Sequence, residues 1–176
     1  MNYKRMGNFL IPITLAITTA ISAGFRTYSI PKVDRPVEYI VIHHTAANEK
    51  TVKDIRKGHL ARGFKDIAYH YVVFSEGRAE SGRNIDKLAA GVWGNSKTTI
   101  EIVLVGELHK RKPTAKQWAA AVGLAAKAAQ VHKLPYWRIR GHREHALPNH
   151  ATACPGISDN LLKQFRLDVK KEMENG

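Results

Sequence analysis

Residues 37–43 read VEYIVIH, a run dominated by β-branched and aromatic residues. Val, Ile and Tyr suit a pleated, buried strand, and neither Gly nor Pro interrupts the run. We therefore expect a buried strand that ends at His43, with a second histidine, His44, directly after it.

Helical and strand patterns alternate along the rest of the chain. Thr114 with Gln117 three residues later has the pattern of a capping box, and Ser158 is a suitable cap for a last helix. Strands are expected at residues 67–74, 78–80, 99–105 and 137–140, helices at 50–62, 114–131 and after Ser158, and a long loop after Gly141. This alternation predicts an α/β fold with a mixed central β-sheet flanked by helices.

The first 33 residues have the composition of a signal peptide or an N-terminal membrane anchor followed by a short linker. Lys4 and Arg5 precede an uncharged run over residues 7–25, whose apolar centre has the size of a secretory h-region. The run also borders on a membrane span, which needs about 17–25 residues. A cleaved signal, a permanent anchor and a weak, later released anchor all fit. Each would export the domain expected at residues 34–176 to the periplasm or cell envelope.

Composition and charge set wider bounds. The 176 residues are 44% hydrophobic, ample for one core, and carry a formal net charge of +13. Such an excess attracts polyanions, which include nucleic acid, anionic lipid and acidic cell-wall polymers. Lys and Arg are scattered and no nucleic-acid-binding motif accompanies them, so we expect no nucleic-acid partner. A basic protein of nucleic acid or membrane surfaces is the weaker alternative.

Two places concentrate residues that can bind a metal, the end of the first strand and the loop after Gly141. They contain His43, His44, His142, His145, His150 and Cys154. A lone cysteine is most often a buried apolar residue, but Cys154 lies in the sequence TACPG, where Pro155 and Gly156 restrict the loop that presents the sulfur. Three N or S ligands with a fourth position left to water form a catalytic zinc site. A closed structural site would need three of the histidines, so the open site is the better interpretation.

Five short motifs resemble those of a known family. They are IHHTA at residues 42–46, AYHY at 68–71, AESGR at 79–83, GHRE at 141–144 and TACPG at 152–156. In this order they are similar to the motifs of the zinc-dependent N-acetylmuramoyl-L-alanine amidases, which include amidase-type phage lysozymes and peptidoglycan recognition proteins. The resemblance covers about residues 37–165 and implies the fold of that family, with peptidoglycan as the substrate.

The resemblance also implies a site. One Zn²⁺ would be held by His43, His142 and Cys154, and the amide bond cut would join N-acetylmuramic acid to the L-alanine of the stem peptide. His44 is the alternative to His43, since successive side chains of a strand point to opposite faces and the two are not expected to be ligands together. Otherwise, His44 is expected on the substrate side.

Two further residues are implied near the chemistry. Tyr69 would lie near the water that attacks the amide, either to orient that water or to donate to the oxyanion, and a half-buried strand tyrosine is its alternative. Thr152 would face the substrate and offer a neutral hydroxyl, which can donate a hydrogen bond without adding charge.

Two positions depart from the pattern of the family. Trp93 stands where a histidine is frequent, and either stacks on substrate or covers the core. Glu101 stands where a small glycine is common, and we expect a solvated carboxylate at the strand edge. The alternative is a side chain that reaches the cleft as a base or an ion-pair partner. His145 and His150 are expected to be loop residues.

The strongest rival to an enzyme is a module that binds peptidoglycan without cutting it. Loss of the cysteine ligand usually marks such modules, and Cys154 is present. The sequence therefore favours a peptidoglycan hydrolase, and we expect it to act as a monomer.

Overall fold

The computed structural model describes residues 29–176, so the expected signal or anchor at residues 7–25 lies outside the described part. Five strands are present there: β1 (Tyr39–His44), β2 (Tyr71–Val73), β3 (Ala79–Ser81), β4 (Thr99–Leu104) and β5 (Ile139–Gly141). The helices are α1 (Val52–Ala61), α2 (Ala115–Val131), α3 (His142–His145) and α4 (Asp159–Asn175), with short 3-10 turns η1 (Tyr136–Arg138) and η2 (Pro148–His150). Among residues 29–176 no helix combines the length and apolar character that a membrane span requires.

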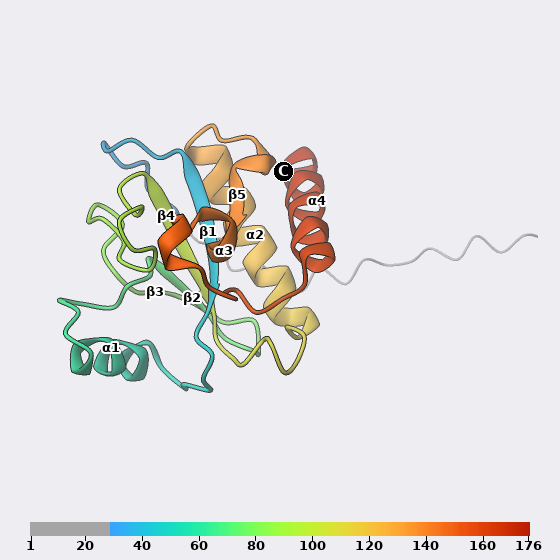
Figure 1. The fold of residues 1–176 in the computed structure, drawn as a ribbon. Coiled ribbons are helices and arrows are strands. Elements are labelled where there is room, and N and C mark those ends of the chain that lie inside the picture. Colours follow the sequence, from blue (N-terminus) through green and yellow to red (C-terminus); the bar gives the residue numbers. More distant parts are fainter. Residues whose placement is uncertain (1–28) are drawn as a thin grey trace, which may run out of the picture.

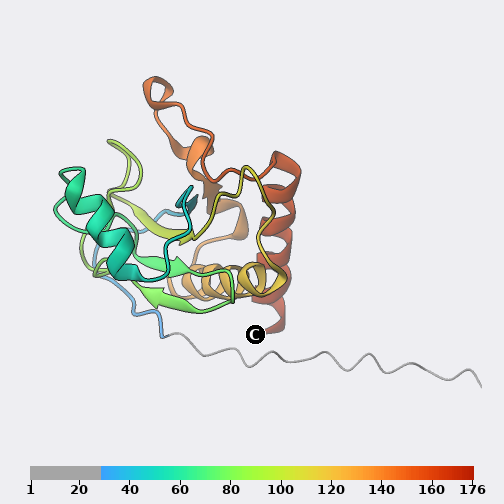
Figure 2. The ribbon, with the colours of Figure 1, turned by 90° about the horizontal axis from the view of Figure 1, so that it is seen from below.

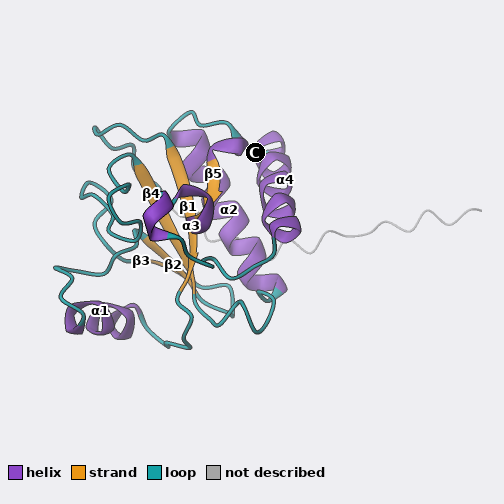
Figure 3. Cartoon of the chain, viewed as in Figure 1, coloured by secondary structure: helices purple, strands orange, loops and turns teal. Residues whose placement is uncertain are grey.

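The strands form one mixed sheet, as the sequence predicts, and their order is β3-β2-β4-β1-β5 (Figure 3). Neighbours are parallel except β3, which runs antiparallel to β2. β1 and β4 occupy the centre, and their register places Val41 beside Glu101 and His43 beside Val103. The ends of β1 and β5 meet at the same edge of the sheet, because Ile42 is paired with Gly141.

Helices cover both faces of the sheet (Figure 1, Figure 2). α2 and α4 lie on one face, where Ile40, Ile42 and the alternate residues of β4 pack against the small alanines of α2. α1 lies on the other face, over a smaller apolar cluster that includes Val103. Since side chains alternate along a strand, His43 and Glu101 point to the α1 side. The larger core therefore lies on the face covered by α2 and α4, and the face covered by α1 is partly polar.

α2 and α4 begin directly after the capping residues that the sequence indicates, Thr114 and Ser158. Ser158 Oγ accepts a hydrogen bond from Leu161 N at 3.2 Å, and Thr114 Oγ1 accepts one from Gln117 N at 3.1 Å. The side chain of Gln117 does not turn back to complete a capping box. It donates to the carbonyl oxygens of Val73 and Val105, both at 2.9 Å, because the buried sheet beneath it offers these acceptors.

Three expected segments differ in detail. The strand expected over residues 67–74 is regular only from Tyr71 to Val73. The strand expected over 137–140 starts as the turn η1, in which Arg138 N donates to Pro135 O. The loop expected after Gly141 is partly helical, since the Glu144 carboxylate accepts from Gly141 N at 2.9 Å and starts α3. Local hydrogen bonds account for the second and third of these differences.

Candidate metal centre

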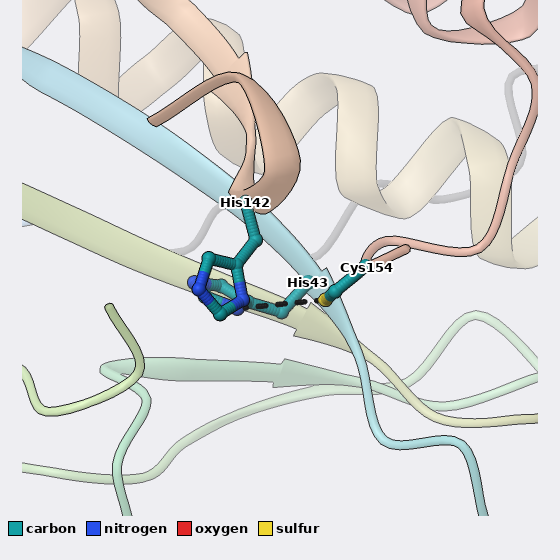
Figure 4. Close-up of side chains that lie close together, drawn as sticks. All are labelled: His43, His142 and Cys154. Carbon is teal, nitrogen blue, oxygen red and sulfur yellow. Dashed lines mark hydrogen bonds between the residues drawn. The ribbon is translucent and has the colours of Figure 1, made fainter. Parts of the chain in front are cut away.

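His43, His142 and Cys154 come together at the edge of the sheet where β1 and β5 end (Figure 4). His43 lies near the end of β1, His142 is the first residue of α3 after β5, and Cys154 comes from the loop before α4. One ligand atom from each lies within 4.8 Å of the others. The Nδ1 atom of His43 is 3.7 Å from Cys154 Sγ.

The donor set and its spacing fit a zinc ion. Zn–N bonds of about 2.0–2.1 Å and a Zn–S bond of about 2.3 Å at a tetrahedral angle put nitrogen and sulfur about 3.6 Å apart. The separation between His43 and Cys154 is close to this value. His43 is 1% exposed, whereas His142 and Cys154 are half-buried, so the cluster is accessible from one side. Two imidazoles and one thiolate with an open side form the donor set of a catalytic site.

Backbone groups hold the loop that carries Cys154. The sulfur accepts a hydrogen bond from His44 N at 3.4 Å, and Cys154 O accepts one from Arg143 N at 2.8 Å. Thr152 Oγ1 accepts from Cys154 N at 3.1 Å. These contacts tie the loop to the end of β1 and to α3.

Glu101 lies directly beneath His43 and is fully buried, so the expectation of a solvated carboxylate at the strand edge is wrong. Its Oε2 atom is 3.4 Å from His43 Nε2. β4 is a central strand covered on both faces, which the local sequence does not show. Burial by itself would raise the pKa of the Glu101 carboxyl, but the contacts with His43 and Ser96 outweigh burial and hold that pKa below its usual range.

The two histidines of the cluster differ in protonation. Burial lowers the pKa of His142 to about 4, so its imidazole is neutral at pH 7 and can offer a lone pair. Burial also acts to lower the pKa of His43, but Cys154 and then Glu101 outweigh it and raise that pKa to about 9. Without a metal, the imidazole of His43 therefore carries an extra proton at neutral pH, and a cation bound at Nδ1 would replace a proton there.

Tyr69 packs beside the cluster. Its ring centroid is 5.0 Å from that of His43 and 5.3 Å from that of His59. Burial, followed by the charges of Cys154 and Glu101, raises the pKa of the phenol further above its usual range. Tyr69 therefore stays protonated at neutral pH and can act as a hydrogen-bond donor.

A cavity of about 750 Å³ opens next to His142. Its wall includes the segment from Leu88 to Gly94, with Phe64 and His150 among the other lining residues. Trp93 lines the cavity, is 71% exposed and has its ring 5.6 Å from that of His150. Trp93 thus does not cover the core.

The remaining histidines occupy other places. His44 is half-buried on the opposite side of β1 from His43, its Nδ1 accepts from Leu108 N at 3.2 Å, and it does not line the cavity. His145 is expected in a loop but is the last residue of α3, and its ring contacts that of Tyr39 in a tilted arrangement with centroids 4.6 Å apart. The structure thus groups Tyr69 with the three metal-ligand candidates and places Trp93 on the cavity. Thr152 contacts the backbone of Cys154, and His44 contacts its sulfur through the backbone N–H while the His44 ring lies on the other side of β1.

Sequence reasoning missed several residues around the site. Phe64, Leu88 and His150 line the cavity, and Gly91 and Ser96 contact the Glu101 carboxylate. Only the unusual Glu101 offered a signal, because a carboxylate in a β-branched strand needs partners when it is buried.

Known proteins share this fold over most of their length. The N-acetylmuramoyl-L-alanine amidase LysC from Clostridium intestinale URNW matches with a TM-score of 0.68 and 20% identity, over 82% of this chain and 99% of that chain. Peptidoglycan recognition protein-LE, a Drosophila melanogaster protein solved in complex with tracheal cytotoxin, matches with a TM-score of 0.61 and 26% identity, over 74% of this chain and 80% of that chain. In sequence, another peptidoglycan-recognition protein of Drosophila melanogaster is 29% identical over 151 residues, covering 78% of this chain and 77% of the relative.

Fold and site together define a protein of the class that contains peptidoglycan recognition proteins and amidase endolysins. The model of one family, described as N-acetylmuramoyl-L-alanine amidase, matches residues 33–157. The chain belongs to this family.

Proposed function

We propose that this protein is a zinc-dependent N-acetylmuramoyl-L-alanine amidase that hydrolyses the bond between N-acetylmuramic acid and the L-alanine of the stem peptide in peptidoglycan. The observation that carries this proposal is the convergence of His43, His142 and Cys154 beside a cavity, in a chain that belongs to the amidase family.

The cavity suits a glycopeptide. Its volume of about 750 Å³ is in the range of small-molecule sites, and Trp93 and His150 offer aromatic faces at its rim. Peptidoglycan recognition protein-LE was solved with monomeric diaminopimelic acid-type peptidoglycan. A similar fragment bound in this cavity would reach the ligand cluster through His142, which belongs to both.

His43, His142 and Cys154 would hold the zinc ion. When bound there, zinc supplies a Lewis acid that polarises a carbonyl and lowers the pKa of water to about 7. The neutral imidazole of His142 is ready to coordinate at pH 7. The hydrogen bond from His44 N helps to hold the sulfur of Cys154 beside His43.

The polar side chains around the cluster would stabilise charge and orient the substrate. Tyr69 stays protonated and donates a hydrogen bond to the oxygen that becomes negative during amide hydrolysis. The hydroxyl oxygen of Thr152 accepts from Cys154 N, so its proton is free to be donated to the substrate. Trp93 holds a sugar or peptide face by stacking.

The proposed substrate, peptidoglycan, lies in the cell envelope. Residues 1–33, as a signal peptide or anchor, would deliver the domain there, and the net charge of +13 would attract it to acidic cell-wall polymers. A proteinase-protection assay on intact spheroplasts tests this location. Protein found only inside the cells would contradict it.

Digestion of purified cell-wall sacculi tests the function. We expect the zinc-loaded protein to release stem peptides with a new L-alanine amino terminus, identified by mass spectrometry, and a chelator to stop the release. Cys154→Ser should remove activity together with zinc. Firm binding to sacculi without any cleavage by the zinc-loaded protein would instead establish a recognition module.

A further inference from the structure

We infer that Glu101 is a positioning residue that holds the imidazole of His43 by its Nε2 atom and thereby directs Nδ1 to the metal. The inference rests on the proposed function in so far as a metal occupies the cluster of His43, His142 and Cys154. It concerns a position that sequence patterns place at a solvated strand edge.

The sheet register brings the two side chains together. Glu101 lies beside Val41 on the neighbouring parallel strand, two residues before the level of His43, and both side chains point to the α1 face. The separation of Glu101 Oε2 from His43 Nε2 is 3.4 Å, longer than a typical N–H···O hydrogen bond and short enough for an ion pair. Nε2 is buried and has no hydrogen-bond partner among residues 29–176. Glu101 is thus the acceptor toward which this buried atom is directed.

Three donors fix the carboxylate in this orientation. Oε1 accepts from Ser96 Oγ at 2.7 Å and from Thr99 Oγ1 at 3.1 Å. Oε2 accepts from Gly91 N at 2.8 Å, which leaves its remaining lone pair for His43. A buried carboxylate with this many donors has a fixed orientation, and it therefore restricts the orientation of the His43 ring beside it.

Gly91 shows how tightly this arrangement is packed. A Cβ atom at this position would lie 2.1 Å from Glu101 Oε2 and 3.0 Å from His43 Cε1. The wall of the cavity, the carboxylate and the histidine therefore touch at this point, and a glycine is required there. Gly91 and Ser96 also line the cavity, so Glu101 links the cavity wall to the metal ligand.

A carboxylate on the outer nitrogen of a metal-binding histidine has a defined effect. It fixes the tautomer with the proton on Nε2, orients the ring and makes Nδ1 a stronger donor, and its loss typically costs about 10-fold to 100-fold in metal affinity. Glu101 is fully buried and both its oxygens are engaged, so it does not reach substrate. It acts through His43 alone.

The zinc affinity of Glu101→Gln tests the inference. Gln keeps the size and the acceptor of the side chain and removes the charge. We expect zinc to bind about 10-fold to 100-fold more weakly in competition with a chromophoric chelator. In the cobalt-substituted protein the visible ligand-field bands should shift, while the sulfur-to-cobalt charge-transfer band of Cys154 persists. Zinc affinity and cobalt spectrum equal to those of wild type would overturn the inference.

Two further variants separate positioning from folding. Gly91→Ala displaces the carboxylate without removing its charge and should also weaken zinc binding. Ser96→Ala removes one of the two donors to Oε1 and should weaken it less than Glu101→Gln. Thermal unfolding of each metal-free variant shows whether it is folded. Because a Cβ at position 91 also crowds the rings of Tyr69 and His43, Ser96→Ala is the variant that decides should Glu101→Gln not fold. Wild-type affinity in a folded Ser96→Ala would then overturn the inference.

The inference and the proposed function can fail separately. Unchanged zinc affinity in Glu101→Gln, together with amidase activity in wild type, would overturn the inference alone. Weakened zinc affinity in Glu101→Gln, with a zinc-loaded wild type that leaves peptidoglycan uncut, would support the inference and overturn the proposed function.

Discussion

His43 and His44 are adjacent in the chain, yet their rings lie in different environments. The ring of His43 faces His142 and Cys154, and the ring of His44 packs against the loop that contains Leu108. Alternation along β1 separates them, so one of the two histidines can join the cluster and the other can support its surroundings.

The ligand set gives the first prediction. Cys154→Ser and His142→Ala should each remove bound zinc and amidase activity, because each deletes one of the three donor atoms of the cluster. His44→Ala is the matched control and should retain about one zinc per protein, because the His44 ring accepts a hydrogen bond from Leu108 N and is not one of the three ligands. Metal analysis by mass spectrometry of the purified variants measures this. A His44→Ala protein as depleted of zinc as His43→Ala would refute the assignment.

Tyr69 gives the second prediction. Tyr69→Phe removes the phenolic donor and keeps the ring that packs on His43. Turnover should fall by about 10²-fold, the usual effect of losing one donor to a developing oxyanion, with zinc content unchanged. Steady-state kinetics on a soluble muropeptide, with metal analysis of the same sample, measure both quantities. Wild-type turnover would reduce Tyr69 to a packing residue.

Trp93 gives the third prediction. It is largely exposed at the rim of the cavity, so Trp93→Ala should leave stability and zinc content intact and raise the KM for muropeptide about 10-fold by loss of stacking. Trp137 is 58% exposed and lies outside the cavity wall, and Trp137→Ala is the matched control. Equal KM values for the two variants would show that Trp93 does not touch substrate.

At the scale of the elements, one side chain of α2 hydrogen-bonds to the strands within residues 29–176, in addition to the apolar packing of the helix on the sheet. Gln117 is fully buried and donates to two carbonyl oxygens, one at the end of β2 and one just beyond β4. This contact holds the helix behind the sheet in register with the strands whose other face bears the candidate site.

Gln117→Leu should therefore destabilise the protein by about 1–2 kcal/mol, because it removes two buried hydrogen bonds. Val73 O keeps its bond from Val105 N, and Val105 O keeps its bond from the Arg111 guanidinium. Gln164→Leu, on the exposed side of α4, is the control and should change the free energy of unfolding by less than about 0.5 kcal/mol. Urea unfolding of both metal-free variants provides the comparison. A Gln117→Leu protein as stable as the control would show that the two bonds donated by Gln117 contribute nothing to stability.

For the whole molecule, His70 links the sheet to the loops that precede the cavity and makes stability depend on pH. Its ring is 1% exposed, its Nδ1 atom accepts from Glu101 N at 3.0 Å, and Nε2 contacts Lys87 O at 2.9 Å. Burial lowers the pKa of His70 to about 4 from an ordinary value of 6.5. The unfolded chain therefore takes up the proton first as the pH falls. The stability that His70 contributes is complete above pH 6.5 and is lost progressively toward pH 4.

A variant that cannot titrate should reveal this dependence. The free energy of unfolding of wild type should exceed that of His70→Asn at pH 7, and the difference should shrink by about 2 kcal/mol at pH 5. Urea unfolding of metal-free proteins at the two pH values measures the difference, and the subtraction removes the contributions of the other histidines. An equal difference at both pH values would mean that His70 is not neutral and buried in solution.

The sequence by itself determined the fold class, the start of the helices after Thr114 and Ser158, and the grouping of His and Cys residues into motifs. These features depend on local patterns of apolar residues, on caps and on short motifs, all of which act over a few residues. The pleat of a strand likewise separates His43 from His44 without any knowledge of distant segments.

Only the tertiary structure decided what surrounds the candidate site. Glu101 is buried because β4 lies at the centre of the sheet, and its contact with His43 depends on the pairing of β1 with β4. The side chain of Gln117 bonds to the carbonyl oxygens of Val73 and Val105 and not to the start of its own helix, because the fold brings these distant acceptors within reach. Hydrogen bonds and ion pairs in a low-dielectric interior depend on which segments meet there, and the local sequence of one strand does not carry that information.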